Sequence, residues 1–163
     1  MRDEQLQELL DQLHSTPAQV AETVDGLPLN AITIRPDSGD FSLLENVCHL
    51  RDIEVEGYSV RIRRILSEDN PKLADINGGK LAAERDYNNQ NLSAALSAFT
   101  EARWQNLSVL KELSDEQFER TGELEGSGQV MLNRLLELMC DHDSDHVDEM
   151  RIARRRLLTS DET

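Results

Sequence analysis

Two histidines four residues apart, His142 and His146, have the spacing in this chain that best suits metal chemistry. On an α-helix, positions i and i+4 project from one face about 40° apart. Two imidazoles buried side by side need partners for their ring nitrogens, and protonating both would bring like charges together. A divalent ion bound by neutral imidazoles meets both needs, and histidine pairs with this spacing chelate metal from one helix. Apolar residues share this face: Leu132, Leu135, Met139, Met150, Ala153 and Leu157.

A third imidazole, His49, lies in the middle of another predicted helix. Its helix face also carries Glu45, Asp52 and Glu56, which could orient the ring or supply a further ligand. Alternatives stay open for all three histidines. The C-terminal pair could be a hydrogen-bonded polar pair in the core, and His49 could be an exposed residue among acids. The fourth histidine, His14, has no helical partner and is interpreted as a surface residue.

The elements that must position these histidines are helices. Apolar residues at i, i+3, i+4 and i+7 indicate the first helix, and Thr16 with Pro17 and Gln19 indicates a fresh helix start after it. Ser42 and Glu45 form a capping box at the start of a long helix. A short turn around residues 81–87 and another capped by Ser114 complete the set. The predicted main helices cover residues 3–14, 16–26, 42–66, 92–113 and 129–158.

The joins between these helices are predicted loops at residues 26–40, 69–91 and 122–128. The only β-strand pattern is short, at residues 31–34. Three or four long helices with short joins predict an all-α fold, an up-and-down four-helix bundle. With 163 residues, the length of one ordinary domain, the chain is expected to form a single domain over residues 1–163.

Composition limits the class of partner. The chain is 38% hydrophobic and 30% charged, as expected of a globular protein. A net charge of −15 argues against nucleic-acid binding, which needs a basic surface. No apolar run reaches the roughly 20 residues of a membrane helix, and the polar start has no signal-peptide core, so a cytoplasmic protein without membrane contact is expected.

Two arginine clusters and two cysteines have simple structural interpretations. The clusters, 61–64 and 151–156, lie near predicted helix ends, where positive charge complements the helix dipole. An anionic ligand held between the clusters is the alternative. Cys48 and Cys140 are predicted to be small buried residues, because neither thiol can easily share a metal with the histidine near it.

The histidine segments also resemble a known family. Residues 41–54 hold an aromatic residue, Ser42, Glu45, His49 and a following acid, an order similar to that of the second helix of DinB-like proteins. The HDSDH run at 142–146 resembles that superfamily's second metal motif. Phe41 stands where Trp is common. Further similar segments are Arg35-Pro36, Glu84 to Tyr87, and the Gly-Ser-Gly before the last helix.

This resemblance to the DinB-like (YfiT-like) superfamily, over essentially the whole chain, implies several properties. It implies a four-helix bundle that binds a divalent metal ion, often zinc or nickel, between helices, and often a homodimer. It assigns His49, His142 and His146 as the metal ligands. The superfamily also includes thiol-dependent transferases related to bacillithiol and mycothiol S-transferases.

Three protein ligands would leave metal positions open, which is the pattern of a catalytic site. The resulting hypothesis is a metal-dependent thiol (S-)transferase or hydrolase acting on a small-molecule substrate or with a low-molecular-weight thiol. Glu45, or else Asp143 or Asp145, could accept a proton, but no residue is assigned catalysis. A non-catalytic, metal-stabilised binding or stress-response module is the second hypothesis, and a metal-free polar core network is the third.

Overall fold

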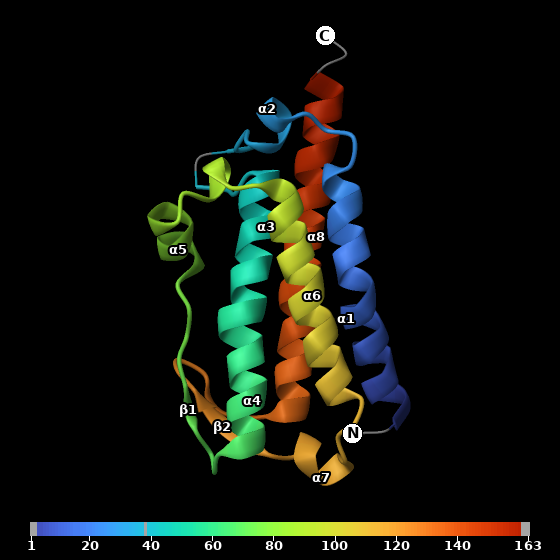
Figure 1. Cartoon of the computed structure of the whole chain (residues 1–163), viewed down its shortest axis with the longest axis vertical. Coiled ribbons are helices and arrows are strands. Elements are labelled where there is room, and N and C mark those ends of the chain that lie inside the picture. Colours follow the sequence, from blue (N-terminus) through green and yellow to red (C-terminus); the bar gives the residue numbers. More distant parts are fainter. Residues whose placement is uncertain (1–2, 38, 161–163) are drawn as a thin grey trace.

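Within residues 3–37 and 39–160, which this computed structural model describes, four long helical rods lie side by side (Figure 1). Short helical elements join them: α2 (Leu29–Ile32), α5 (Gly78–Glu84), η2 (Tyr87–Asn89) and α7 (Asp115–Phe118). The predicted all-α four-helix bundle is confirmed. The rods are α1 (Asp3–Val24), the run of α3 (Leu43–Asp52), η1 (Ile53–Tyr58) and α4 (Ser59–Ser67), then α6 (Leu92–Leu110) and α8 (Leu132–Ser160).

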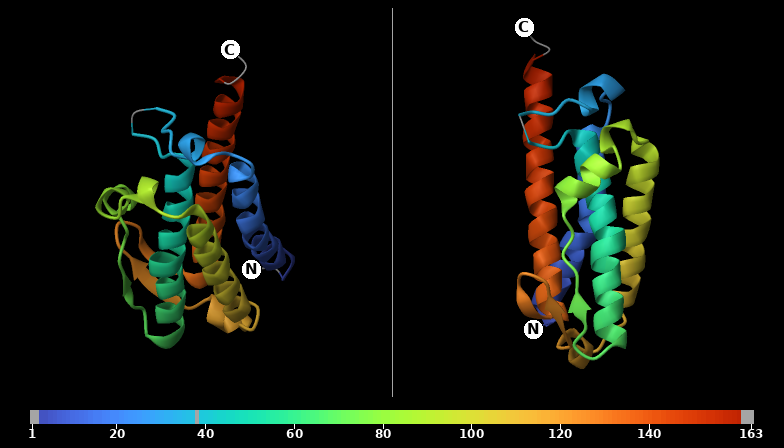
Figure 2. Two further views of the ribbon diagram at one scale, coloured as in Figure 1. Left: turned by 45° about the horizontal axis from the view of Figure 1, so that its top comes forward. Right: turned by 90° about the vertical axis from the view of Figure 1, so that its left-hand side faces the viewer.

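The rods do not simply alternate in direction. In Figure 1, α1 and α8 run upward, whereas the α3–α4 rod and α6 both run downward. Two successive rods can share a direction because residues 68–91 carry the chain back along the outside of the bundle (Figure 2). Around the bundle, α1 and α3 each pack against both α6 and α8. The returning segment packs against α3 through α5 and η2, so it can contribute to a site on that rod.

The first rod differs from the sequence prediction of two helices. α1 is continuous from Asp3 to Val24, with Pro17 inside it. Proline lacks the N–H that would bond to the carbonyl four residues earlier, which here belongs to Leu13. That carbonyl accepts a hydrogen bond from Arg103 Nη1 at 3.0 Å instead. The tertiary contact therefore supplies the bond that proline removes, and Thr16, predicted as a cap, donates to the Gln12 carbonyl within the helix.

The second rod begins as predicted and contains a wider turn. Ser42 accepts from the Glu45 N–H and Glu45 accepts from the Ser42 N–H, so the capping box is confirmed. The rod continues to Ser67, close to the predicted end at residue 66. Residues Ile53–Tyr58 form a π-helical turn, a feature that frequently lies at functional sites and that periodicity did not predict.

A small sheet at the base of the bundle was not predicted. β1 (Lys72–Leu73) pairs parallel with β2 (Thr121–Leu124), and β2 pairs antiparallel with β3 (Gly128–Met131). The predicted flexible connection is thus a hairpin, and α8 begins three residues later than expected. The strands are too short and too polar to give an alternating pattern, and the turn depends on positive φ angles of 79° at Gly126 and 82° at Gly128.

The short β-strand pattern at residues 31–34, within the predicted loop 26–40, does not form a strand. Residues Leu29–Ile32 form one helical turn, α2, in which the Pro28 carbonyl accepts from the N–H groups of Ala31 and Ile32. The segment has no neighbouring strand, so its backbone groups are satisfied locally instead. No helix of the described residues has the length and apolar character to cross a membrane.

The core is divided in two by a polar layer. One hydrophobic cluster includes Leu13 of α1 and Leu107 of α6, and the other includes Val20 of α1 and Phe99 of α6. Between them along α6 lies Arg103, which is fully buried. The corresponding residues on the other rods are polar and buried as well: Thr16 on α1, Glu54 in η1 and Asp143 on α8.

Arginines of both clusters donate hydrogen bonds to backbone carbonyls of the chain itself. Arg154 donates to the Thr23 and Asp25 carbonyls at the C-terminal end of α1, and Arg61 donates to the Ala74 carbonyl. In Figure 1, α4 and the C-terminal half of α8 lie at opposite ends of the bundle. A single small anion held between the two clusters is therefore excluded.

Candidate metal centre

The three predicted histidines meet between α3 and α8. One nitrogen of each imidazole lies within 4.8 Å of one nitrogen of each of the other two. His49 Nε2 is 3.1 Å from His142 Nε2, and the His142 and His146 ring centroids are 4.6 Å apart, one helical turn along α8. The fourth histidine, His14, is exposed on α1, as predicted.

The sequence suggested that His142 and His146, which share an apolar helix face, would be more buried than His49. The structure shows the reverse order. His49 is only 8% exposed, whereas the side chains of His142 and His146 are 25% and 15% exposed. His49 is covered because the returning segment packs over it: a Cβ on Gly78 would lie 2.4 Å from His49 Cε1. An alanine at position 78 would have to displace the His49 ring or the returning segment. The centre is more open on its α8 side.

Hydrogen bonds assign the protonation of His146. Asn46 Nδ2 donates to the Ser42 carbonyl, so Asn46 Oδ1 is the atom that faces His146 Nδ1, at 2.7 Å. This oxygen can only accept, so Nδ1 must carry the proton and donate it. His146 Nε2 is left with a free lone pair, which is the state of a metal-binding nitrogen. Asn46 lies one turn before His49 on α3, and sequence reasoning missed it.

The other two rings have unsatisfied nitrogens. Within the described residues, His49 Nδ1 and His142 Nδ1 are buried and have no hydrogen-bond partner. Buried polar atoms of proteins are nearly always bonded, so these exceptions indicate that the trio is incomplete by itself. Two nitrogens bound to one tetrahedral zinc ion at about 2.0–2.1 Å would lie about 3.3 Å apart, close to the Nε2 separation of His49 and His142.

The electrostatic setting keeps imidazoles neutral. Burial, followed by the nearby His142, lowers the pKa of His49 to about 4. Burial, followed by His142 and His49, lowers the pKa of His146 to about 3. A divalent metal binds neutral imidazole, so both rings are in the ligand state at neutral pH. On donor type, protonation and spacing, the residues present fit a divalent ion.

The three carboxylates on the helix face of His49, which could have oriented the ring or bound the metal, are bound by arginines instead. Arg35 Nε donates to Glu45 Oε2 at 2.9 Å, and the Ser42 N–H donates to the same oxygen at 2.8 Å. Burial alone would raise the pKa of Glu45, but these bonds hold it below its ordinary value. Asp52 accepts from Arg51, Arg85 and Tyr87, and Arg85 also binds Glu56. These groups hold the returning segment against α3.

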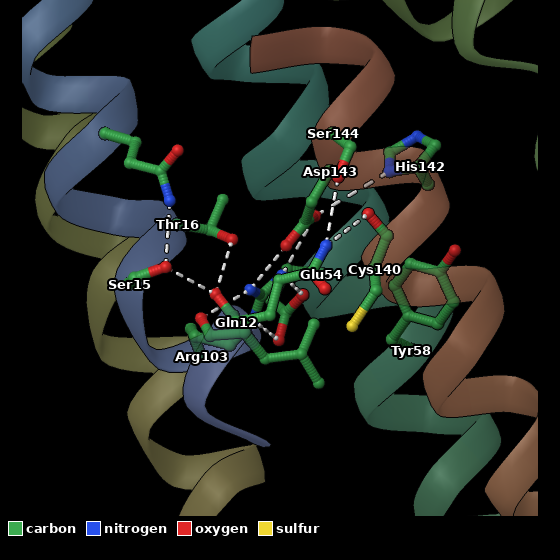
Figure 3. Close-up of polar contacts among 12 residues, drawn as sticks. Gln12, Ser15, Thr16, Glu54, Tyr58, Arg103, Cys140, His142, Asp143 and Ser144 are labelled. Carbon is green, nitrogen blue, oxygen red and sulfur yellow. Dashed lines mark hydrogen bonds and ion pairs between the residues drawn. The ribbon is translucent and has the colours of Figure 1, made fainter. Parts of the chain in front are cut away.

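The remaining candidates for proton transfer differ in burial and in their distance from the histidines. Asp143 is buried and bound to Arg103, so it does not face a substrate (Figure 3). Asp145 is exposed on α8. Glu149, which sequence reasoning did not select, places Oε2 3.5 Å from His146 Nδ1. Burial, followed by Asp40 and Asp145, raises the pKa of Glu149. Its position one turn after His146 was the available sequence signal.

A small cavity of about 210 Å³ is lined by two residues that contact the histidines, Phe41 and Glu149. The Phe41 ring centroid lies 5.4 Å from that of His49, and Glu149 contacts His146, so two lining residues touch the trio. The other lining residues are apolar or charged: Pro36, Ile152 and Ala153 are apolar, and Asp40 and Arg156 are charged. Phe41 is partly buried, packs against the core and also lines this cavity.

The cysteines take no part in the centre. Both are buried, and each sulfur faces a backbone carbonyl, that of Tyr87 for Cys48 and that of Leu9 for Cys140. Burial raises the pKa of Cys48 to about 11 and that of Cys140 to about 12. The prediction of small buried residues is confirmed.

Known proteins share this fold. The model of the DinB superfamily matches residues 12–150. A protein of Oceanobacillus iheyensis, named putative metal-dependent hydrolase, is 24% identical over 143 residues, 87% of this chain and 81% of that protein. YfiT from Bacillus subtilis, described as a probable metal-dependent hydrolase with an unusual four-helix bundle topology, has a TM-score of 0.89 at 21% identity. That match covers 96% of this chain and 90% of YfiT.

Proposed function

The chain belongs to the DinB superfamily, and on that premise we propose that it is a metal-dependent hydrolase whose divalent ion binds to His49, His142 and His146. The observation that carries the proposal is the convergence of three imidazoles from two rods, one nitrogen of each within 4.8 Å of the others. Neutral rings and the facing Nε2 atoms of His49 and His142 support it. Zinc or nickel is the proposed metal, since both accept imidazole ligands.

The chain's own residues would bind the substrate and manage its protons. A bound divalent ion would act as a Lewis acid and would activate a nucleophile. Phe41 and Ile152 offer an apolar surface to a small molecule in the cavity beside the histidines. Glu149 is the carboxylate placed to accept a proton there, because it touches His146 whereas Glu45 and Asp143 are bound to arginines.

A thiol transferase is the second candidate reaction, because an open metal position can also bind a low-molecular-weight thiol. Neither buried cysteine of the chain can supply that thiol. We further propose that residues 1–163 act as one domain, that the chain forms a homodimer in the cytoplasm, and that it does not bind nucleic acid, in keeping with its net charge of −15.

Turnover assays test the function. Zinc- or nickel-loaded protein would be supplied with small esters, amides and phosphoesters, and separately with thiols and electrophiles. We expect hydrolysis that requires the metal and is lost in His142→Ala, with the melting temperature of the metal-free variant near that of wild type. Activity with thiols alone would select the transferase. Absence of turnover in every assay, together with a large loss of stability on metal removal, would favour a non-catalytic, metal-stabilised module.

A further inference from the structure

A buried ion cluster lies directly behind His142 (Figure 3). Arg103 of α6 is 0% exposed, and all five of its N–H donors are used. It binds both oxygens of Glu54, at 2.9 and 2.8 Å, and both oxygens of Asp143, at 2.7 and 3.2 Å. Its remaining donor goes to the Leu13 carbonyl, at 3.0 Å. Arg103 thus bonds to residues of α1, η1 and α8, and these bonds fix the position of the Asp143 carboxylate.

The cluster has one negative charge more than it has positive charges. Two carboxylates share one guanidinium, and among the described residues no second arginine or lysine forms an ion pair with either of them. Asn106 Nδ2 donates to Glu54 at 2.7 Å but brings no charge. A surplus charge away from water is costly unless a nearby positive charge offsets it.

The two carboxylates differ in what else they face. Asp143 Oδ1 lies 4.0 Å from His142 Nδ1, a buried atom without a hydrogen-bond partner in the described part of the chain. Glu54 binds Arg103 and Asn106 and has no histidine within ion-pair distance. The opposite nitrogen of His142, Nε2, is the one that faces His49. The imidazole of His142 therefore stands between the ion cluster and the histidine centre.

We infer that Asp143, held by Arg103, is a positioning residue for the metal centre: it orients His142 through Nδ1 and offsets the charge of the bound dication. This inference rests on the proposed function. A carboxylate on the second nitrogen of a metal-binding histidine fixes the ring and makes it a better ligand. Of the three rings, His146 has Asn46 as the partner of its Nδ1 and His49 Nδ1 lies against Gly78, whereas His142 Nδ1 faces the buried Asp143 carboxylate.

A matched pair of variants tests the inference. Asp143→Asn and Glu54→Gln each remove one negative charge from the same cluster and one bidentate partner from Arg103. Zinc affinity would be measured by competition with a chromophoric chelator, and the absorption spectrum of the cobalt-substituted protein would report ligand geometry. We expect Asp143→Asn to bind zinc about 10–100-fold more weakly and to change the cobalt spectrum. Glu54→Gln leaves the Asp143 carboxylate beside His142, so it should keep the wild-type cobalt spectrum and lose much less zinc affinity, although metal-free stability falls in each.

A second measurement avoids any variant that folds poorly. In zinc-loaded wild-type protein, the His142 Nδ1 proton should be seen by nitrogen-15 NMR as a slowly exchanging, downfield-shifted signal. Rapid exchange with water would overturn the inference, as would equal zinc affinities for Asp143→Asn and Glu54→Gln. Failure of wild-type protein to bind zinc or nickel would instead remove the proposed function itself, so the two failures are distinguishable.

Discussion

Two neighbouring polar groups, the Arg103 group in the layer that divides the core and the histidine group beside it, differ in how their donors and acceptors are satisfied. The Arg103 group is complete, since every N–H of its guanidinium meets an oxygen. The histidine group is incomplete, with unpartnered Nδ1 atoms on His49 and His142 and their Nε2 atoms facing each other. The first arrangement stabilises the bundle, whereas the second is suited to a ligand from outside the chain.

Arg103→Met would break the complete group and should have the largest effect. It leaves Glu54 and Asp143 buried without their cation, and the expected loss is about 3–5 kcal/mol of unfolding free energy in a urea titration. Arg64→Met is the control, because Arg64 forms an exposed i, i+4 pair with Glu68. The control should lose only a small fraction of that free energy, because the pair is exposed to solvent. Similar losses in the two variants would contradict the distinction.

Acidification should weaken the metal-free protein through the histidine group. The folded-state pKa values of about 4 for His49 and about 3 for His146 lie below the unfolded value. The unfolded chain therefore takes up protons first. Stability is fully present above about pH 6.5 and is lost as pH falls toward 4, by about 2–4 kcal/mol between pH 7 and 5. Urea titrations across this range measure the slope.

Variants of single histidines show which residues cause the pH dependence of the unfolding free energy. His146→Gln should lose about half of the pH dependence, because one of the two titrating groups is gone. His14→Gln should keep all of it, because His14 is exposed on α1. Equal slopes in wild type and His146→Gln would show that other groups cause the acid sensitivity.

Two asparagines allow the histidine group and the Arg103 group to be tested separately. Asn46 orients His146, whereas Asn106 binds Glu54 in the ion cluster. Asn46→Ala should weaken zinc binding about tenfold or more, because His146 loses its acceptor. Asn106→Ala should lower stability by about 1–3 kcal/mol and leave zinc affinity near wild type. An equal effect of both variants on zinc affinity would argue against separate roles.

Two neighbouring glycines give the smallest expected effect. A Cβ at Gly78 would lie 2.6 Å from His49 Nδ1, whereas a Cβ at Gly79 would meet nothing closer than Asn77 Oδ1 at 3.6 Å. Gly78→Ala must displace the ring or the returning segment, at about 1 kcal/mol, and zinc affinity should fall about fivefold. Gly79→Ala should match wild type in the same chelator competition. Unchanged affinity in Gly78→Ala would show that the ring is not held by this contact.

Helical periodicity and capping predicted most of the bundle. The apolar repeats and the Ser42 capping box placed the second and third long helices to within a few residues. Pro17 led to the wrong prediction of a second helix start within α1. The hydrogen bond that replaces its missing N–H comes from Arg103, 86 residues later in the chain, and no local pattern encodes that contact. The sheet was missed for a similar reason, since β1 is two residues long and pairs with β2 about 50 residues away.

The histidine centre was predicted in its members but not in its surroundings. The i, i+4 spacing on α8 and the family resemblance selected the three rings. Partners of the acids depend on tertiary packing, so Glu45, Asp52 and Glu56 were expected to face the rings when Arg35 and Arg85 in fact bind them. His49 is buried by Gly78, which the helix pattern around His49 could not indicate.

The most direct test of the account is a metal titration. Purified metal-free protein would be supplied with zinc or nickel, and bound metal would be determined by elemental analysis after gel filtration. We expect about one ion per chain in wild type and in His14→Ala, and almost none when His49, His142 and His146 are replaced together by alanine. Wild-type protein that stays metal-free, or a triple variant that binds as much metal as wild type, would contradict the account.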